Sequence, residues 1–316
     1  MPFTHLLQHF KPIQFSYNGL KFLTAVSCLL LLVNRCADGQ EKRAEKNAAE
    51  PAFQYPLAVV AASDGTIFVA DLKLPGIWQI KDGKKSVYFQ ASQKFKTPLN
   101  RIRCLAIDHE GKLLAGCTGS RDVFRFDEKG QPVSLMPGPL PGMPMAIAVA
   151  TDGTIYVADT ELHRIWKTPA AGSAAPEEFA VINSPRGLTF DAEGNLVVLS
   201  VSSANGQIQK VTSDGKIEPF VKGHPFNFPH NIVHATDGSF FVTDNYDHCV
   251  WKIKPDGSRQ KFKAGAPFDR PVGLCLSGEN LLVTDPHLKT IFQLTQTGEF
   301  SVFATDNPTA QKPNAK

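Results

Sequence analysis

A turn signal of the Asp-Gly type recurs six times along this 316-residue chain and constrains its fold more than any other feature. The six turns are Asp64-Gly65, Glu110-Gly111, Asp152-Gly153, Glu193-Gly194, Asp237-Gly238 and Glu279-Asn280. They lie 41 to 46 residues apart, and a proline stands eight residues before five of them. An apolar run such as TIFVAD or TIYVAD follows each turn. Self-similarity at a fixed period indicates a repeat architecture.

Each repeat holds four short apolar runs that are separated by turn residues, with a second turn of the kind seen at Asp82-Gly83. Asp-Gly between apolar runs predicts a two-residue hairpin turn, in which both turn residues adopt positive φ. No window of this region keeps a helical period. The sequence therefore predicts an all-β fold, a six-bladed β-propeller with four antiparallel strands per blade over residues 53–304. Both ends of the repeat region already carry four strands, so no strand exchange between the first and last blades is expected.

The two ends of the chain have a different composition from the repeats. An apolar run of twelve residues within residues 1–39 is too short to span a membrane and predicts a signal peptide, with an uncleaved N-terminal anchor or a lipidated Cys36 as alternatives. Residues 40–52 form a charged spacer, and residues 305–316 are predicted to be a disordered tail. We therefore expect an exported protein, periplasmic or secreted, whose mature domain does not insert into a membrane.

The charge of the chain limits the partners to be expected. The net charge is +3 and no basic run is present, which argues against nucleic acid as a partner. A small anionic ligand or a protein partner is expected instead, and the propeller is expected to be a monomer.

The repeat pattern Pro-x-Gly-Leu…Asp-x-x-Gly…Leu-Val-x-Asp…Arg-Ile resembles the NHL repeat and the wider propeller superfamily of regucalcin, gluconolactonase and strictosidine synthase. Residues 144–167 and 185–200 carry the likeness best, and it covers about four fifths of the chain. The resemblance to NHL repeats implies a binding or interaction module, because such propellers often bind partners or small ligands. The resemblance to the enzymes implies the alternative, a divergent lactonase-like hydrolase or lyase. A shared fold does not decide between them.

The residue that follows each repeat's proline position begins the innermost strand, so six such residues are predicted to surround the mouth of the central channel. These mouth residues are Leu57, Arg103, Met145, Arg186, His230 and Val272. Guanidinium groups in a low-dielectric concavity favour planar anions, so Arg103, Arg186 and His230 predict an anion-binding site. His248, Asp244 and Arg270 are secondary candidates on the same face.

An alternative explanation of these arginines is that they pair with aspartates of neighbouring loops. Asp71, Asp159, Asp244 and Asp285 end the second apolar run in four repeats. Repetition at fixed spacing favours a structural role, in which a short carboxylate accepts backbone N–H groups and fixes the loop. The three tryptophans share one repeat position, seven residues after such an aspartate, and are predicted to pack between blades.

The resemblance implies metal ligands at particular positions, and this sequence lacks them. Regucalcin and gluconolactonase hold a divalent cation with a Glu, two Asn and an Asp, but the corresponding positions here are Leu57, Arg103, Arg186 and His230. The zinc site of the amidating-enzyme lyase uses Pro-His-x-Leu/Ile motifs in three blades, and only residues 229–232 match. No mouth residue is the glutamate of a strictosidine-synthase-like enzyme. We therefore expect no metal site and no cofactor, with a divalent cation as the alternative.

Four cysteines follow residue 39. Cys104 and Cys117 lie symmetrically about the Glu110-Gly111 turn and are predicted to be directly opposed on neighbouring strands. An oxidising compartment favours a disulfide, but cross-strand geometry strains such a bond, so a disulfide and two buried thiols are the alternatives. Cys249 and Cys275 are predicted to be small core residues.

Overall fold

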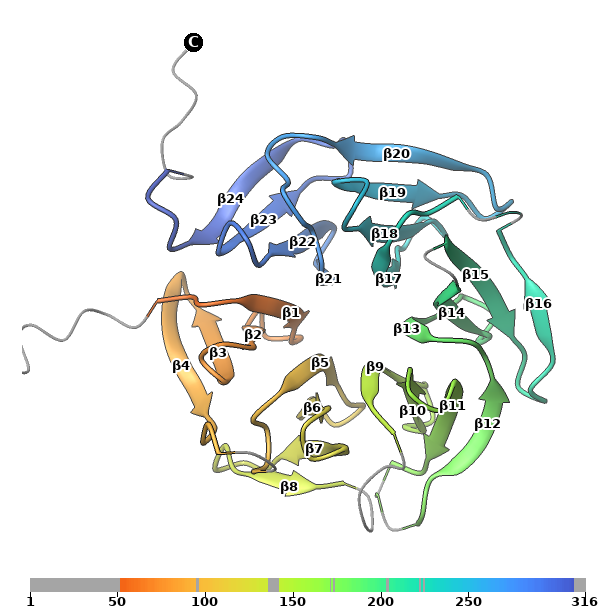
Figure 1. Cartoon of the computed structure of the whole chain (residues 1–316), viewed down its shortest axis with the longest axis horizontal. Helices are drawn as coiled ribbons and strands as arrows, with labels where there is room; N and C mark the ends of the chain where they lie inside the picture. The colour runs from red at the N-terminus through yellow and green to blue at the C-terminus, as the bar shows by residue number, and fades with distance from the viewer. Residues whose placement is uncertain are drawn as a thin grey trace, which may run out of the picture. The chain divides into compact units, whose positions relative to one another are not determined.

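The computed structural model describes residues 52–309, apart from 95–96, 136–141, 171, 173, 203–204, 222 and 224. Twenty-four strands form six four-stranded antiparallel sheets within this part of the chain, and Figure 1 shows them as blades around a centre. The predicted six-bladed β-propeller is confirmed. No helix in the same residues is long and apolar enough to cross a membrane. The predicted signal peptide, almost all of the spacer and the end of the tail lie outside the described residues.

The strands follow the chain from the inner to the outer edge of each blade. Blades 1 and 2 consist of β1 (Pro56–Ala61), β2 (Ile67–Asp71), β3 (Gly76–Lys81), β4 (Lys84–Gln90), β5 (Ile102–Ile107), β6 (Leu113–Cys117), β7 (Asp122–Phe126) and β8 (Pro132–Ser134). Blades 3 and 4 consist of β9 (Pro144–Val149), β10 (Ile155–Asp159), β11 (Arg164–Thr168), β12 (Glu177–Val181), β13 (Pro185–Phe190), β14 (Leu196–Ser202), β15 (Asn205–Val211) and β16 (Ile217–Pro219). Blades 5 and 6 consist of β17 (Pro229–His234), β18 (Phe240–Asp244), β19 (Cys249–Ile253), β20 (Arg259–Ala264), β21 (Leu274–Ser277), β22 (Asn280–Asp285), β23 (Thr290–Leu294) and β24 (Phe300–Thr305).

The ring closes without strand exchange, as predicted, because the first and last blades each contain four consecutive strands. Side chains join them instead. Thr284 Oγ1 donates a hydrogen bond to the Leu57 carbonyl (3.0 Å), and the Phe53 N–H donates to Asp306 Oδ2 (2.6 Å). Lys85 also pairs with Asp306, immediately after β24.

The hydrophobic core lies between neighbouring blades, and the tryptophans belong to it as predicted. Trp78 is fully buried in a cluster that also contains Leu282 and Ile291 of blade 6. Trp166 packs against a cluster shared by blades 2 and 3, and Trp251 packs against one shared by blades 4 and 5.

In blades 1 to 5 the turn between the first two strands differs from the predicted two-residue type, whereas in blade 6 Ser277 pairs with Asn280 across a two-residue turn. The Ala62 N–H donates to the Thr66 carbonyl (2.8 Å), which leaves three residues in the turn, and only Gly65 has positive φ (81°). Glycine supplies the left-handed position of this three-residue hairpin at no steric cost. The two-residue type with positive φ at both positions occurs at Asp82 and Gly83.

The longer turn shifts the strand register and corrects the predicted pairing of Cys104 with Cys117. Cys104 lies opposite Gly116, and Cys117 lies opposite Ile102. The two thiols enter different core clusters, Cys104 between blades 2 and 3 and Cys117 between blades 1 and 2. A Cβ on Gly116 would lie 2.4 Å from Cys104 Sγ, so the glycine leaves room for this sulfur. All four described cysteines are buried, and the structure joins none of them in a disulfide, so two buried thiols at Cys104 and Cys117 stay a prediction.

Alkylation under denaturing, non-reducing conditions should therefore modify both Cys104 and Cys117. Burial raises the pKa of Cys104 to about 12, so the native protein should react slowly at this position. Peptide mapping by mass spectrometry measures both outcomes, and a Cys104–Cys117 linked peptide would contradict the register seen here.

Candidate functional site

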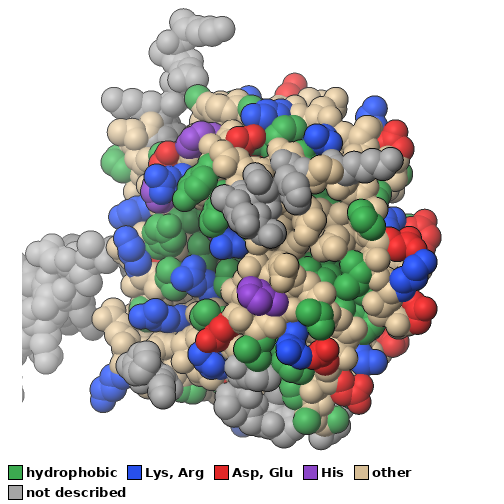
Figure 2. Space-filling model, turned by 45° about the vertical axis from the view of Figure 1, so that its right-hand side comes forward, with side chains coloured by type: hydrophobic (Ala, Val, Ile, Leu, Met, Phe, Trp, Pro, Cys, Tyr) green, Lys and Arg blue, Asp and Glu red, His purple; other side chains and the backbone are tan. Residues whose placement is uncertain are grey.

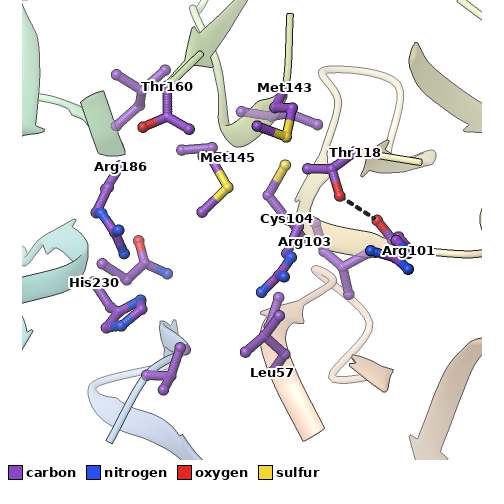
Figure 3. A pocket seen from close by; sticks show the side chains of 18 of the residues that line it. Leu57, Arg101, Arg103, Cys104, Thr118, Met143, Met145, Thr160, Arg186 and His230 are labelled. Carbon is purple, nitrogen blue, oxygen red and sulfur yellow. Dashed lines mark hydrogen bonds between the residues drawn. The ribbon is translucent and has the colours of Figure 1, made fainter. Parts of the chain in front are cut away.

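The six mouth residues line one cavity of about 950 Å³ at the centre of the propeller. Figure 3 shows Arg103 and Arg186 reaching into it from two sides, with His230 beside Arg186 and with Met145 and Leu57 on the remaining walls. The repeat therefore placed these positions correctly. Their role in ligand binding stays a prediction.

A repeated β-bulge aims these side chains at the channel. In each of blades 1 to 5 the residue after the first one of the inner strand is skipped in the pairing with the second strand. Pro185, for example, pairs with Ser200 and Gly187 pairs with Leu199, which leaves Arg186 unpaired. A bulge bends its strand and redirects a side chain. The bulges thus direct one side chain from each of these blades into the channel.

Arg103 and Arg186 are not neutralised by acidic groups. The arginine ion pairs in the described part of the chain join Arg121 to Glu161, Arg125 to Asp108 and Arg164 to Glu178. Burial lowers the pKa of both Arg103 and Arg186, and for Arg186 the charge of Arg103 lowers it further. Like charges therefore face each other across the cavity.

An aromatic stack holds the Arg186 side chain in place. Its guanidinium carbon lies 4.4 Å from the centre of the Phe228 ring, and Phe228 stacks on Tyr246 at 4.8 Å. The Nε atom of Arg186 is buried and has no hydrogen-bond partner among the described residues. A cation over an aromatic face is stabilised without losing its charge, so the group stays available to an anion.

The loop aspartates serve the backbone, so the alternative in which they pair with Arg103 and Arg186 is wrong. Asp159 accepts hydrogen bonds from the N–H groups of Met143, Glu161 and Leu162, each at 3.0 Å. Asp244 and Asp285 are fully buried and accept backbone N–H groups in the same way. The predicted loop-fixing role of these carboxylates is confirmed.

His230 is held in its neutral form. Burial lowers its pKa from 6.5 to about 3, and the charges of Arg186 and Arg103 contribute further. Its ring packs edge-on against Phe228, with the ring centres 5.2 Å apart. At neutral pH the imidazole therefore offers one hydrogen-bond donor and one acceptor to the cavity.

This shift of the His230 pKa should make the protein less stable in mild acid. Below pH 6.5 the unfolded chain binds a proton at this histidine that the folded chain does not bind, so the free energy of unfolding falls as the pH drops towards 3. The His230→Gln variant lacks this contribution. From pH 7.5 to pH 5, wild type should lose about 1 kcal/mol more than the variant. Urea unfolding at both pH values measures it, and equal losses would contradict a neutral His230.

The secondary candidates do not line the cavity. Asp244 is buried beneath its loop, and His248 is exposed and contacts the carbonyl oxygen of Asp269 through its ring Nδ1. The Arg270 side chain is exposed, and its backbone N–H donates to Asp285 (2.8 Å). Asp244 ends β18, His248 and Arg270 lie in loops, and none of the three belongs to the channel lining.

Several lining residues have no counterpart in the repeat pattern. Arg101, Thr118, Ser120, Arg121, Met143 and Thr160 come from the segments before the inner strands and from the loops between second and third strands. A sequence signal for these residues was available, because the segment before each inner strand and the loop after each second strand lie on the same face of the propeller. Arg101 and Arg121 raise the number of arginines among the described lining residues to four, and none of these residues is Asp or Glu.

The residues that line the cavity do not provide the ligands of a cation site. No group of three or more His, Cys, Asp or Glu side chains that could hold a metal ion occurs in the residues described. Hard divalent cations need oxygen ligands, and the lining offers arginines where carboxylates would be required.

Comparison with known proteins adds a family match. A model of the virginiamycin B lyase family matches residues 97–315. Peptidyl-glycine alpha-amidating monooxygenase A from Xenopus laevis is 22% identical over 253 residues, which are 71% of this chain and 27% of that protein. Virginiamycin B lyase from Nocardia farcinica is 28% identical over 141 residues, 45% of this chain and 47% of that protein. The chain thus spans less than half the length of these curated relatives.

Solved structures share the fold. Virginiamycin B lyase from Staphylococcus aureus superposes with a TM-score of 0.63 at 21% identity, over 80% of this chain and 85% of that one. A gluconolactonase from Xanthomonas campestris gives 0.64 at 17% identity, over 79% and 88%. These matches show the propeller fold, while the closer likeness to NHL repeats stays a prediction.

Proposed function

Since the chain belongs to the virginiamycin B lyase family, we propose that it uses the channel mouth shared by such propellers, here to bind a small organic anion as an exported binding module. One observation carries this proposal. In the part of the chain that the structure describes, Arg103 and Arg186 have no carboxylate partner and face each other in a cavity without an acidic lining residue. An anion between them would relieve the repulsion and form charge-assisted hydrogen bonds.

The size and the walls of the cavity favour an organic ligand. A volume of about 950 Å³ is in the range of sites for drug-sized molecules and far exceeds an inorganic ion. Leu57, Met145 and Val272 give the cavity apolar walls beside its arginines. The ligand we propose therefore carries an anionic group and an apolar or neutral body.

A thermal-shift screen with matched pairs tests this function. Each pair consists of an organic carboxylate or sulfonate and its neutral amide, so that charge is the main difference within the pair. The proposal predicts that the anions raise the melting temperature and that the amides do not. Equal shifts within the pairs, or shifts with neither member, would contradict it.

A second candidate is a lyase or lactonase activity, which the family match favours. Removal of a proton next to a carbonyl needs a base and a group that stabilises the developing oxyanion. Among the described lining residues, His230 would be the base, and Arg103 and Arg186 would stabilise the oxyanion. A pKa of about 3 makes free His230 a weak base, which is why we rank this candidate second.

Virginiamycin B and gluconolactone, taken from the relatives' names, are the substrates to try for this second candidate. Their loss can be followed by mass spectrometry with wild type and with His230→Ala. The binding-module proposal predicts no turnover by either protein. Turnover by wild type that is absent in the variant would replace it with the enzyme.

Elemental analysis separates the two candidates further. We expect no stoichiometric zinc, calcium or magnesium in residues 40–316 purified without a chelator or an affinity metal, because the lining lacks carboxylates and its arginines repel cations. One bound metal per chain would contradict this expectation and favour the enzyme.

A further inference from the structure

A second cavity adjoins the channel mouth on the side of blades 1 and 2. Its volume is about 510 Å³, and its lining consists of Leu72, Lys73, Pro75, Gln93, Asn100, Arg101 and Arg103. Arg101 and Arg103 line both cavities, so the two spaces meet at these side chains. We refer to the second cavity as the side groove.

The side groove continues the positive charge of the channel. Lys73 and Arg101 form no ion pair with a carboxylate among the described residues, and no Asp or Glu lines the groove. The Lys73 ammonium instead lies 5.1 Å from the centre of the Tyr55 ring. Lys73, Arg101, Arg103 and Arg186 thus form a basic track through both cavities. In Figure 2, Lys and Arg side chains lie among hydrophobic ones on the left half of the visible face, and Asp and Glu side chains are most frequent along the right edge.

The acidic group nearest in sequence does not neutralise this track through a direct ion pair. Asp71 is fully buried, and its carboxylate accepts N–H groups of Gln54, Tyr55, Lys73, Leu74 and the Trp78 indole. These bonds fix the loop that carries Lys73. The ammonium is therefore presented by a well-anchored loop.

The floor of the groove is also built from ordered contacts. Asn100 is 8% exposed, its Nδ2 donates to the Lys94 carbonyl (3.1 Å), and Cys117 Sγ lies 3.8 Å from its Oδ1. Leu99 beside it is fully buried. Such a floor gives the side groove a defined shape, to which a ligand can be complementary.

We propose that the ligand is an elongated organic dianion. One anionic group lies between Arg103 and Arg186 in the channel, and the second lies in the side groove beside Lys73 and Arg101. The inference rests on the proposed anion-binding function and specifies its ligand class. Joining two anionic groups on one chain makes the second contact intramolecular, so a dianion of matching length binds more tightly than a monoanion.

Calorimetric titration with linear α,ω-dicarboxylates of increasing length, each compared with the monocarboxylate of the same length, tests the inference. Wild type should bind the monocarboxylates and should bind the best dicarboxylate at least about ten-fold more tightly. Lys73→Glu, which reverses a charge of the side groove, should remove this preference, because it should lower dicarboxylate affinity more than monocarboxylate affinity. Lys84→Glu, an equally large charge change on exposed β4, is the matched control and should keep the preference.

The outcomes separate this inference from the proposed function. Binding of monocarboxylates without any dicarboxylate preference would overturn the dianion and leave the anion site standing. A preference that survives Lys73→Glu would show that the side groove is not the second position. No binding of either series would overturn the proposed function itself.

Discussion

Replacing Arg103 and Arg186 together by alanine is expected to weaken organic-anion binding at least about 100-fold, because hydrogen bonds to charged groups contribute about 1.5–3 kcal/mol each. Both side chains reach into the channel and neither has a carboxylate partner to release. The variant should have a stability close to that of wild type, because the relieved repulsion between two like charges offsets the lost contact of Arg186 with Phe228. Calorimetric titration measures the affinity, and thermal unfolding measures the stability.

The matched control is the double variant Arg259→Ala with Arg270→Ala. It removes the same charge from exposed positions outside the cavity and should keep its affinity within about two-fold, since distant surface charges are screened by salt. If both double variants lost affinity equally, net charge would be the cause and the proposed site would be wrong.

Replacing Asp159 by alanine is expected to lower the free energy of unfolding by about 3–5 kcal/mol, the range for breaking a buried hydrogen-bond network. The carboxylate is 1% exposed and accepts three backbone N–H groups together with the Trp166 indole N–H (2.9 Å). Alanine would leave these donors without a partner. Asp159 anchors both the segment before β9, which carries Met143, and the loop after β10, which carries Thr160. Both residues line the cavity, so anion binding should weaken as well. Urea unfolding gives the stability change.

Asp152→Ala is the matched control for this prediction. Asp152 is an exposed turn residue whose carboxylate accepts one backbone N–H, from Thr154 at 2.9 Å. Its loss should cost about 1 kcal/mol or less. Similar losses at Asp152 and Asp159 would contradict the role assigned to the buried carboxylates.

The repeat made the fold predictable, and the details of its turns did not follow from it. Four apolar runs per period, repeated six times, leave few architectures other than a propeller. The Asp-Gly signal does not distinguish a two-residue turn from a three-residue turn, because both place glycine at positive φ. That single residue of difference moved Cys104 from Cys117 to Gly116.

The channel residues were predictable for a similar reason, whereas the loop residues were not. Arg103, Arg186 and His230 occupy one position of the repeat, so the register alone brought them together. The stack of Phe228 on Tyr246 and the side groove depend on loop conformations that do not repeat. The order of the strands predicts His248 and Arg270 on the same face as the channel mouth. Both residues lie in loops and do not belong to the channel lining.

A crystal structure of residues 40–316 with a bromine-substituted organic carboxylate, recorded at the bromine absorption edge, tests the central claim most directly. The account predicts an anomalous peak in the channel cavity, with the carboxylate between Arg103 and Arg186 and within hydrogen-bond distance of both. Bromine found elsewhere, with a metal ion or solvent alone between these arginines, would contradict an anion-binding channel.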